Sequence, residues 1–160
     1  MEERIAAIPP IIRREIEAQM VVALVDRYAS VLGRPQAIAL ARESIQALAE
    51  KAGRQIADQR KNNSLEELAR VVQEVWAREE ALQITFHGVT HDRLDFDVHR
   101  CRYAELYETL GMRDMGGHLS CCRDAAYARG FNAAIQMERT QTIMEGAPFC
   151  DFRFVLPTPL

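Results

Sequence analysis

The sequence predicts an α+β fold in which N-terminal helices pack on a small antiparallel sheet of about four strands with two further helices. Up to about residue 80, apolar residues recur every three or four positions, which is the spacing of one helical face. From Leu82 onward they alternate with polar residues, as in a half-buried strand. We therefore expect residues 1–160 to form a single domain, with a helical scaffold at 11–80 and an α+β region carrying the candidate site at 82–156.

The composition excludes several classes of protein. The 160 residues are 27% charged and 48% hydrophobic, with a formal charge of -3. This chain lacks the basic excess of a nucleic-acid-binding protein, so nucleic acid is not an expected partner. It has no apolar run long enough to cross a membrane, and its acidic start does not resemble a signal peptide. We expect a cytoplasmic protein whose four cysteines are free thiols rather than disulfides.

Two long helices are expected before residue 61. The first, at about 11–32, follows Pro9-Pro10 and ends at Gly33, a favourable residue after a helix C-terminus. The second, at about 35–60, has Pro35 in its first turn and an apolar stripe in steps of three and four. That stripe fits either a hairpin with the first helix or the seam of a homo-oligomer, and both helices are assigned to the scaffold. The expected apolar face of the first helix consists of Ile12, Ile16, Met20, Ala23 and Val25.

A third helix is expected at about 64–80. Ser64-Leu65-Glu66-Glu67 fits a capping box, in which Ser64 and Glu67 satisfy each other's backbone amides. Trp76 lies on the apolar stripe of this helix and is expected to anchor it against the sheet.

A β-hairpin follows, with strands at 82–87 and 94–99 and a turn near 91–93. One face of the hairpin is apolar and is expected to pack on the helices. We assign the other face to solvent, except at His99, which leads into Cys101. The polar residues on that face are His87, Asp95, Asp97 and His99.

Two helices are predicted next, at about 102–110 and 118–129. The first places Cys101 at a helix N-terminus, where the helix dipole favours a thiolate over a thiol. The second puts two pairs of residues on shared helical faces, because their members are three or four positions apart. These pairs are Cys121 with Asp124, and His118 with Cys122.

The last two strands are expected at 132–139 and 150–156. In the final strand, Cys150 and the aromatic residues after it point to one face, while Asp151 and Arg153 point to the other. Unless a bulge intervenes, only one of these two sets lines a pocket. We favour Cys150, because its aromatic neighbours suit a small planar ring.

The order of these motifs resembles the L-2-amino-thiazoline-4-carboxylic acid hydrolase family over about residues 82–156. The chain departs from the expected pattern at Asn132-Ala133, where we expect Asn-Pro. The resemblance rests on Cys101, Leu110-Gly111, Cys121-Cys122-Arg123-Asp124, Phe131-Asn132, Arg139-Thr140-Gln141-Thr142, Gly146 and Cys150-Asp151-Phe152-Arg153-Phe154. It implies hydrolytic opening of a cyclic amidine-like or amide-like C–N bond in a small molecule, the type substrate being a thiazoline that yields carbamoyl-cysteine. The predicted fold is also similar to sensor domains related to 4-vinyl reductase, which bind ligands without catalysis.

Two mechanisms fit three clustered cysteines. In the first, a thiolate adds to the ring carbon, a carboxylate or histidine relays protons, and water resolves the adduct. The expected catalytic residues are Cys101, Cys121, Asp124 and Cys150, and the expected substrate-binding residues are His118, Arg139, Asp151 and Arg153. Arg139 or Arg153 would bind a substrate carboxylate.

In the second mechanism, the three cysteines, with His99 or His118, hold a zinc ion that activates water. No CxxC or HExxH spacing supports this alternative. We therefore expect no metal and no cofactor.

Overall fold

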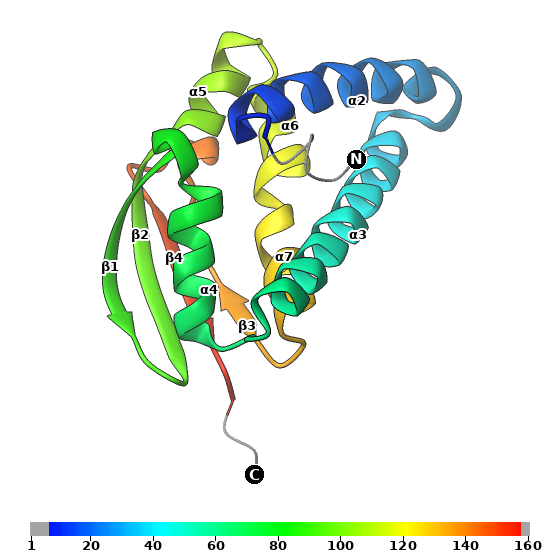
Figure 1. Ribbon diagram of the computed structural model, residues 1–160. Helices are drawn as coiled ribbons and strands as arrows, with labels where there is room; N and C mark the ends of the chain where they lie inside the picture. Colours follow the sequence, from blue (N-terminus) through cyan, green and yellow to red (C-terminus); the bar gives the residue numbers. More distant parts are fainter. Residues whose placement is uncertain (1–6, 158–160) are drawn as a thin grey trace.

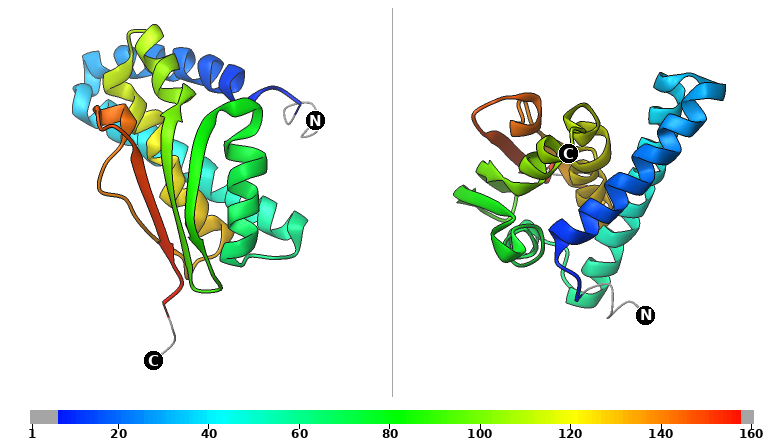
Figure 2. Two further views of the ribbon diagram at one scale, coloured as in Figure 1. Left: turned by 90° about the vertical axis from the view of Figure 1, so that its left-hand side faces the viewer. Right: turned by 90° about the horizontal axis from the view of Figure 1, so that it is seen from above.

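A computed structural model describes residues 7–157 and has the predicted α+β architecture (Figure 1). One antiparallel sheet has the strand order β1-β2-β4-β3. The helices cover one face of this sheet, with α4 and α7 nearer to it and α3 beyond them (Figure 2). The strands are β1 (Leu82–Val89), β2 (Arg93–Cys101), β3 (Gln136–Glu138) and β4 (Cys150–Val155).

The two long N-terminal helices form a hairpin. Helix α2 (Pro10–Leu32) and helix α3 (Arg34–Arg60) are joined by Gly33, whose φ is 82°. Glycine adopts this positive φ without the steric cost that a side chain would add. The Gly33 N–H donates to the Ala29 carbonyl at 3.0 Å. Both helices begin and end within two residues of the predicted positions, 11–32 and 35–60.

Of the five residues expected on the buried face of α2, only Val25 is buried. Ala18 and Val25 are buried, with exposed fractions of 1% and 2%, whereas Ile16 and Met20 are 61% and 63% exposed. Periodic apolar residues identify a candidate face, but the neighbouring elements decide which side of the helix is covered. The exposed residues recur every four positions and are named the α2 stripe: Ile12, Ile16, Met20, Leu24 and Tyr28.

The third helix is shorter than predicted and irregular at its end. Helix α4 (Leu65–Val71) continues as a π-helical turn, η1 (Val72–Trp76), and a 3₁₀ turn, η2 (Arg78–Glu80). Only half of the predicted capping box forms. Ser64 Oγ accepts the Glu67 N–H at 3.2 Å, but the Ser64 N–H donates to Asn62. The Glu67 carboxylate is bound by Arg70 at 2.7 Å instead.

The second half of the chain keeps the predicted order of elements, but the predicted helix at 118–129 is divided between two elements, η3 and α7. The residues expected to form one helix at 118–129 continue a helical path that starts at residue 113 and includes a π-helical turn. The third strand is only three residues long. The remaining elements are α5 (Arg102–Thr109), α6 (Arg113–Gly116), η3 (Gly117–Cys121), α7 (Arg123–Phe131) and the 3₁₀ turn η4 (Ile143–Glu145).

Helices α3 and α7 approach each other at a pair of glycines, which we call the glycine crossing (Gly53 and Gly130). A Cβ atom at Gly53 would overlap the Tyr127 carbonyl oxygen, and one at Gly130 would overlap the Glu50 carbonyl oxygen. The two backbones are therefore in direct contact. Glycine is required at both positions because neither backbone can move away without separating the helices.

Two apolar clusters fill the interior. One lies between the sheet and α4, η1 and α7, and includes Phe96 and Phe152 with their rings stacked 4.7 Å apart. Trp76 packs at 6.4 Å from Phe152, so it anchors its helix against the sheet as predicted. The second cluster joins α2 and α3 to α5 and η3 around Tyr107. In residues 7–157, no helix has the length and apolarity needed to cross a membrane.

Replacing Gly53 or Gly130 with alanine is expected to lower the free energy of unfolding by about 1–3 kcal/mol, because the added methyl group overlaps backbone atoms. Gly117→Ala is the matched control, since a Cβ at this helical glycine meets nothing within 4 Å. Thermal and urea denaturation of the three variants would measure the difference. Unchanged stability of Gly53→Ala and Gly130→Ala would contradict the close helix contact.

Self-association through the N-terminal helices remains a prediction, and the α2 stripe is the surface that would carry it. We expect light scattering of the parent protein to give more than one chain per particle, and an Ile16→Glu, Leu24→Lys double variant to be monomeric. Val89→Glu, at an exposed apolar residue on β1, is the control. A parent protein that is monomeric at about 100 μM would show that the α2 stripe does not mediate self-association.

Candidate functional site

Strand β4 directs its side chains as the sequence predicted. Cys150, Phe152 and Phe154 are buried on the face that packs on the helices, and Asp151 and Arg153 alternate with them on the outer face. No bulge interrupts the pairing of β4 with β2. Of the two sets that the sequence left in competition, the structure therefore turns Cys150 toward the interior.

A cavity of about 370 Å³ lies between the sheet and the helices, and we call it the inner cavity. Much of its wall is apolar and aromatic, with Trp76, Tyr127 and Phe152 among its residues. Five of the predicted site residues also line it, contributed by the end of β2, by η3, by the start of α7, by the segment after β3 and by the start of β4. These are Cys101, Cys121, Asp124, Arg139 and Cys150.

Burial raises the pKa of all three cavity thiols. It raises the pKa of Cys101 to about 11, although backbone N–H groups of Ala104 and Tyr103 oppose the shift. The prediction that the start of α5 would favour a Cys101 thiolate is therefore wrong for the ligand-free protein, because desolvation outweighs the first-turn amides. Burial also raises the pKa of Cys121, and the nearby Asp124 carboxylate raises it further.

Cys150 has the surroundings most favourable to a thiolate. Burial raises its pKa as well, but the Ile143 N–H donates to Cys150 Sγ at 3.2 Å and the Arg139 charge acts in the same, lowering direction. A hydrogen bond and a positive charge both stabilise negative sulfur. Of the three thiols, Cys150 therefore has both a donated hydrogen bond and a nearby guanidinium in support of its ionised form.

An ion pair holds the polar side of the cavity. Arg139 donates to Asp124 Oδ2 at 2.6 Å and to the Cys121 carbonyl at 3.2 Å, and its guanidinium lies 4.9 Å from the centre of the Phe152 ring. Burial raises the pKa of Asp124, and Arg139 opposes that shift. The pair connects α7 and η3 to the segment after β3, so it fixes the positions of Cys121 and Asp124 relative to the sheet.

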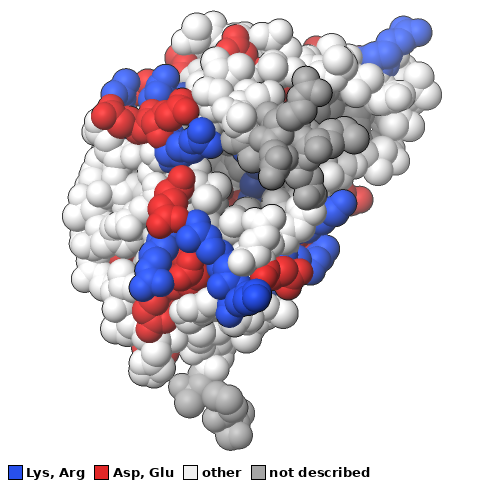
Figure 3. Space-filling model, in the orientation of Figure 1, with Lys and Arg blue, Asp and Glu red and all other residues white. Residues whose placement is uncertain are grey.

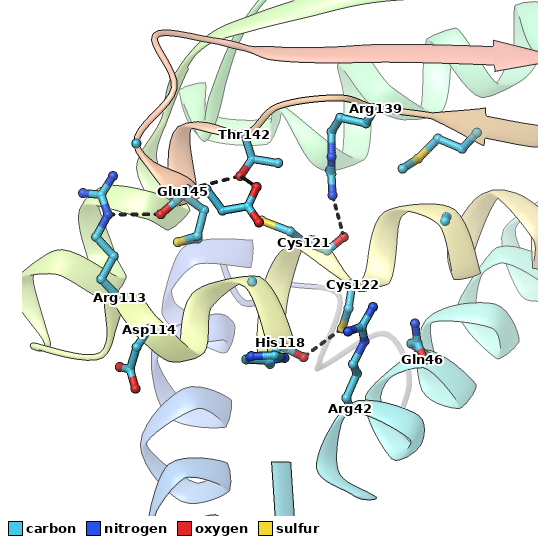
Figure 4. A pocket seen from close by; sticks show the side chains of 15 residues that line it. Arg42, Gln46, Arg113, Asp114, His118, Cys121, Cys122, Arg139, Thr142 and Glu145 are labelled. Atoms are coloured by element: carbon cyan, nitrogen blue, oxygen red, sulfur yellow. Dashed lines mark hydrogen bonds between the residues drawn. The ribbon is translucent and has the colours of Figure 1, made fainter. Parts of the chain in front are cut away.

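His118 lies outside the inner cavity, in an outer groove of about 780 Å³ (Figure 4). Arg42 and Gln46 reach into this groove from α3, on the same side as His118. Cys121, Arg139 and Met144 line both the groove and the inner cavity, so they form the wall between the two hollows.

Asp151 and Arg153 do not line either hollow. Arg153 donates to Asp97 Oδ1 at 2.9 Å, and Asp97 Oδ2 lies 2.8 Å from His87 Nε2. Asp151 accepts the Thr140 hydroxyl at 2.6 Å and the backbone N–H groups of Thr140 and Gln141. The alternation of β4 places both side chains on the outer face of the sheet, away from the cavity.

The two histidines considered for zinc do not join the three cysteines at the inner cavity. His99 packs against the Phe149 ring at 6.1 Å between ring centres, while His118 is in the outer groove. Among residues 7–157, no three His, Cys, Asp or Glu side chains are placed to hold a metal ion. The absence of a metal in the protein stays a prediction.

The inner cavity also has residues that the sequence pattern assigned to the scaffold. Arg14 and Glu17 of α2 and Arg123 of α7 line it. Arg14 and Glu17 are three positions apart on a helix, which ordinarily indicates a solvent-exposed ion pair. Of these three residues, only Arg123 could have been suspected from the sequence, because it lies inside the Cys121-Cys122-Arg123-Asp124 motif. Nothing in the sequence indicated that it contacts α2.

Comparison with known protein families matches residues 13–154 to the family described as L-2-amino-thiazoline-4-carboxylic acid hydrolase. A search of curated proteins finds no match. A similar solved structure is the crystal structure of the phenol-responsive sensory domain of the transcription activator PoxR with phenol. It has 15% sequence identity and a TM-score of 0.48, and the alignment covers 84% of this chain and 71% of that chain.

The raised thiol pKa values predict slow alkylation. At pH 8, iodoacetamide should modify Cys101 in the folded protein about 100-fold more slowly than in the urea-unfolded protein. Peptide mass spectrometry would measure the two rates. Because the pKa of Cys101 rises from 9.0 to about 11 on folding, its contribution to stability is complete below pH 9 and declines as the pH approaches 11. Alkylation of Cys101 at pH 8 at the same rate in the folded and the unfolded protein would contradict the raised pKa.

Proposed function

Because this chain belongs to the L-2-amino-thiazoline-4-carboxylic acid hydrolase family, we propose that it is a small-molecule hydrolase that opens an amidine-like or amide-like ring in the inner cavity with cysteine participation. The family name is that of a hydrolase and supports the reaction type. The observation that carries the proposal is the convergence of Cys101, Cys121 and Cys150 with Asp124 on one cavity. The cavity has room for a small planar ring and an apolar wall against which such a ring can pack.

The proposed chemistry needs a nucleophile because the carbon between two heteroatoms of such a ring is stabilised by resonance. Cys150 is the proposed nucleophile, since the Ile143 N–H and Arg139 support its ionised form. Asp124 is the proposed proton relay, because a carboxylate with a raised pKa both accepts and returns a proton more readily near neutral pH. Cys101 and Cys121 are the alternative nucleophiles.

In the first step, Cys150 Sγ bonds to the ring carbon and its proton passes to Asp124. The bond from this carbon to the leaving ring atom then breaks, and that atom, nitrogen in a cyclic amide or amidine and sulfur in a thiazoline opened to an N-carbamoyl product, takes the proton from Asp124. In the second step, water bonds to the same carbon, its proton is relayed by Asp124 to sulfur, and the C–S bond breaks. The sum is one ring and one water converted to one ring-opened product, with the thiol and the carboxylate restored.

A second candidate function is ligand binding without turnover. The protonated thiols favour it, because a buried thiol in an apolar cavity also serves as an ordinary small packing residue. The two candidates differ in one measurable respect, which is whether the bound ring is opened.

Replacement of Cys150 by serine is expected to lower ring-opening turnover by about 100-fold or more while ligand binding persists, and Asp124→Asn should lower it by about 10²–10⁴-fold. Turnover and binding would be measured against a panel of cyclic amidines and amides that includes 2-amino-thiazoline-4-carboxylate. Cys122→Ser is the matched control, because Cys122 is adjacent to the site but does not line the inner cavity.

The same panel separates the outcomes. Full turnover in Cys150→Ser, Cys101→Ser and Cys121→Ser would end the cysteine mechanism. A parent protein that binds rings tightly but opens none of them would identify the ligand-binding function instead.

A further inference from the structure

The charges that line the inner cavity do not balance. Among the described residues of its wall are four arginines and two carboxylates, Glu17 and Asp124. On the surface, by contrast, basic and acidic side chains lie next to one another (Figure 3), as in the Arg54–Glu50 ion pair. Unbalanced charge is tolerated in water but is costly in a cavity with apolar walls.

The surplus charge is located at the α2 side of the cavity, where Arg13, Arg14 and Arg123 line the wall together with one carboxylate, Glu17. Arg139 has its own carboxylate in Asp124. Arg14 and Arg123, in contrast, share one carboxylate oxygen, Glu17 Oε2, at 2.6 and 2.8 Å. Two guanidinium groups therefore surround a single negative charge.

Both arginine side chains are largely removed from solvent, with exposed fractions of 15% for Arg14 and 19% for Arg123. Burial lowers the pKa of Arg123, and the nearby Arg14 charge lowers it further. The buried Nε of Arg14 has no hydrogen-bond partner among the described residues. An unused donor and a surplus positive charge in one place are what a bound anion would satisfy.

We propose that Arg14 and Arg123 bind the carboxylate of the cavity's ligand. The proposal rests on the proposed function in one respect, which is that the ligand occupies the inner cavity. A carboxylate is a planar monoanion, so it matches both the guanidinium geometry and the surplus of one charge around Glu17. With the carboxylate held by α2 and α7, the ring of the ligand is left to the side of the cavity that carries the thiols.

This assignment differs from the one that the sequence suggested. Arg153 is on the outer face of the sheet and bonded to Asp97. Arg139 is in the cavity, but its charge is already compensated by Asp124. Arg14 and Arg123 are the cavity arginines that share one carboxylate, and they therefore determine whether an acidic ring is preferred over a neutral one.

Benzoate and benzamide test this preference, because they have nearly the same shape and differ in charge. Calorimetric titration of the parent protein should give binding of benzoate at least about ten-fold tighter than binding of benzamide. Arg14→Gln should remove the preference, and Arg14→Lys, which keeps the charge but loses the planar fork, should retain part of it. Arg42→Gln is the matched control, because Arg42 lines only the outer groove.

A Glu17→Gln variant tests the same idea in the opposite direction. Removing the shared carboxylate enlarges the surplus positive charge, so benzoate should bind more tightly than to the parent protein. Equal affinities of the parent protein for benzoate and benzamide would overturn the proposal. So would an Arg14→Gln variant that keeps the preference for benzoate together with a Glu17→Gln variant that binds benzoate more weakly.

Ring opening of 2-amino-thiazoline-4-carboxylate is measured in parallel, so that the two proposals fail separately. A preference for benzoate without opening of any ring would leave the carboxylate site in place and end the hydrolase proposal. Ring opening without a preference for benzoate would support the hydrolase proposal and end the proposed carboxylate site.

Discussion

The contact between Gly53 and Gly130 is the constraint on which the arrangement of the helices depends. It allows α7 to lie directly on α3, with backbone against backbone. Helix α7 in turn carries Arg123 and Asp124 at its first turn. A larger residue at either glycine would move this turn away from α3, and with it the two charged groups that line the inner cavity. The positions of Arg123 and Asp124 in the cavity wall therefore depend on two residues that have no side chain.

The inner cavity combines groups that oppose one another energetically. Its apolar wall raises the pKa of the thiols, whereas Arg139 and the Ile143 N–H stabilise negative charge at Cys150. Arg139 also separates the inner cavity from the outer groove, because it lines both. One side chain thus compensates Asp124, influences the sulfur and forms part of a wall, so substitutions of Arg139 affect charge and shape together.

The sequence predicted the elements better than their contacts. Alternation along a strand is a local property, so the inward direction of Cys150 followed from its neighbours. The convergence of Cys101, Cys121 and Cys150 on one cavity was expected because these three residues would have to meet to form one site. The parts that failed depend on distant neighbours: the face of α2 that is covered, and the extent of burial that raises the pKa of Cys101. No local pattern indicates how α2 contributes to the cavity, because that depends on which elements pack against it.

The outer face of the sheet has a consequence for the cavity on the other side. A slip of β4 by one residue would exchange its two faces, sending Cys150 into solvent and a carboxylate into the apolar interior. Such a slip would also break the Arg153–Asp97 ion pair and the three hydrogen bonds that Asp151 accepts. These polar contacts on the outer face therefore stabilise the observed pairing of β4 with β2, in which Cys150 faces the interior, relative to a pairing shifted by one residue.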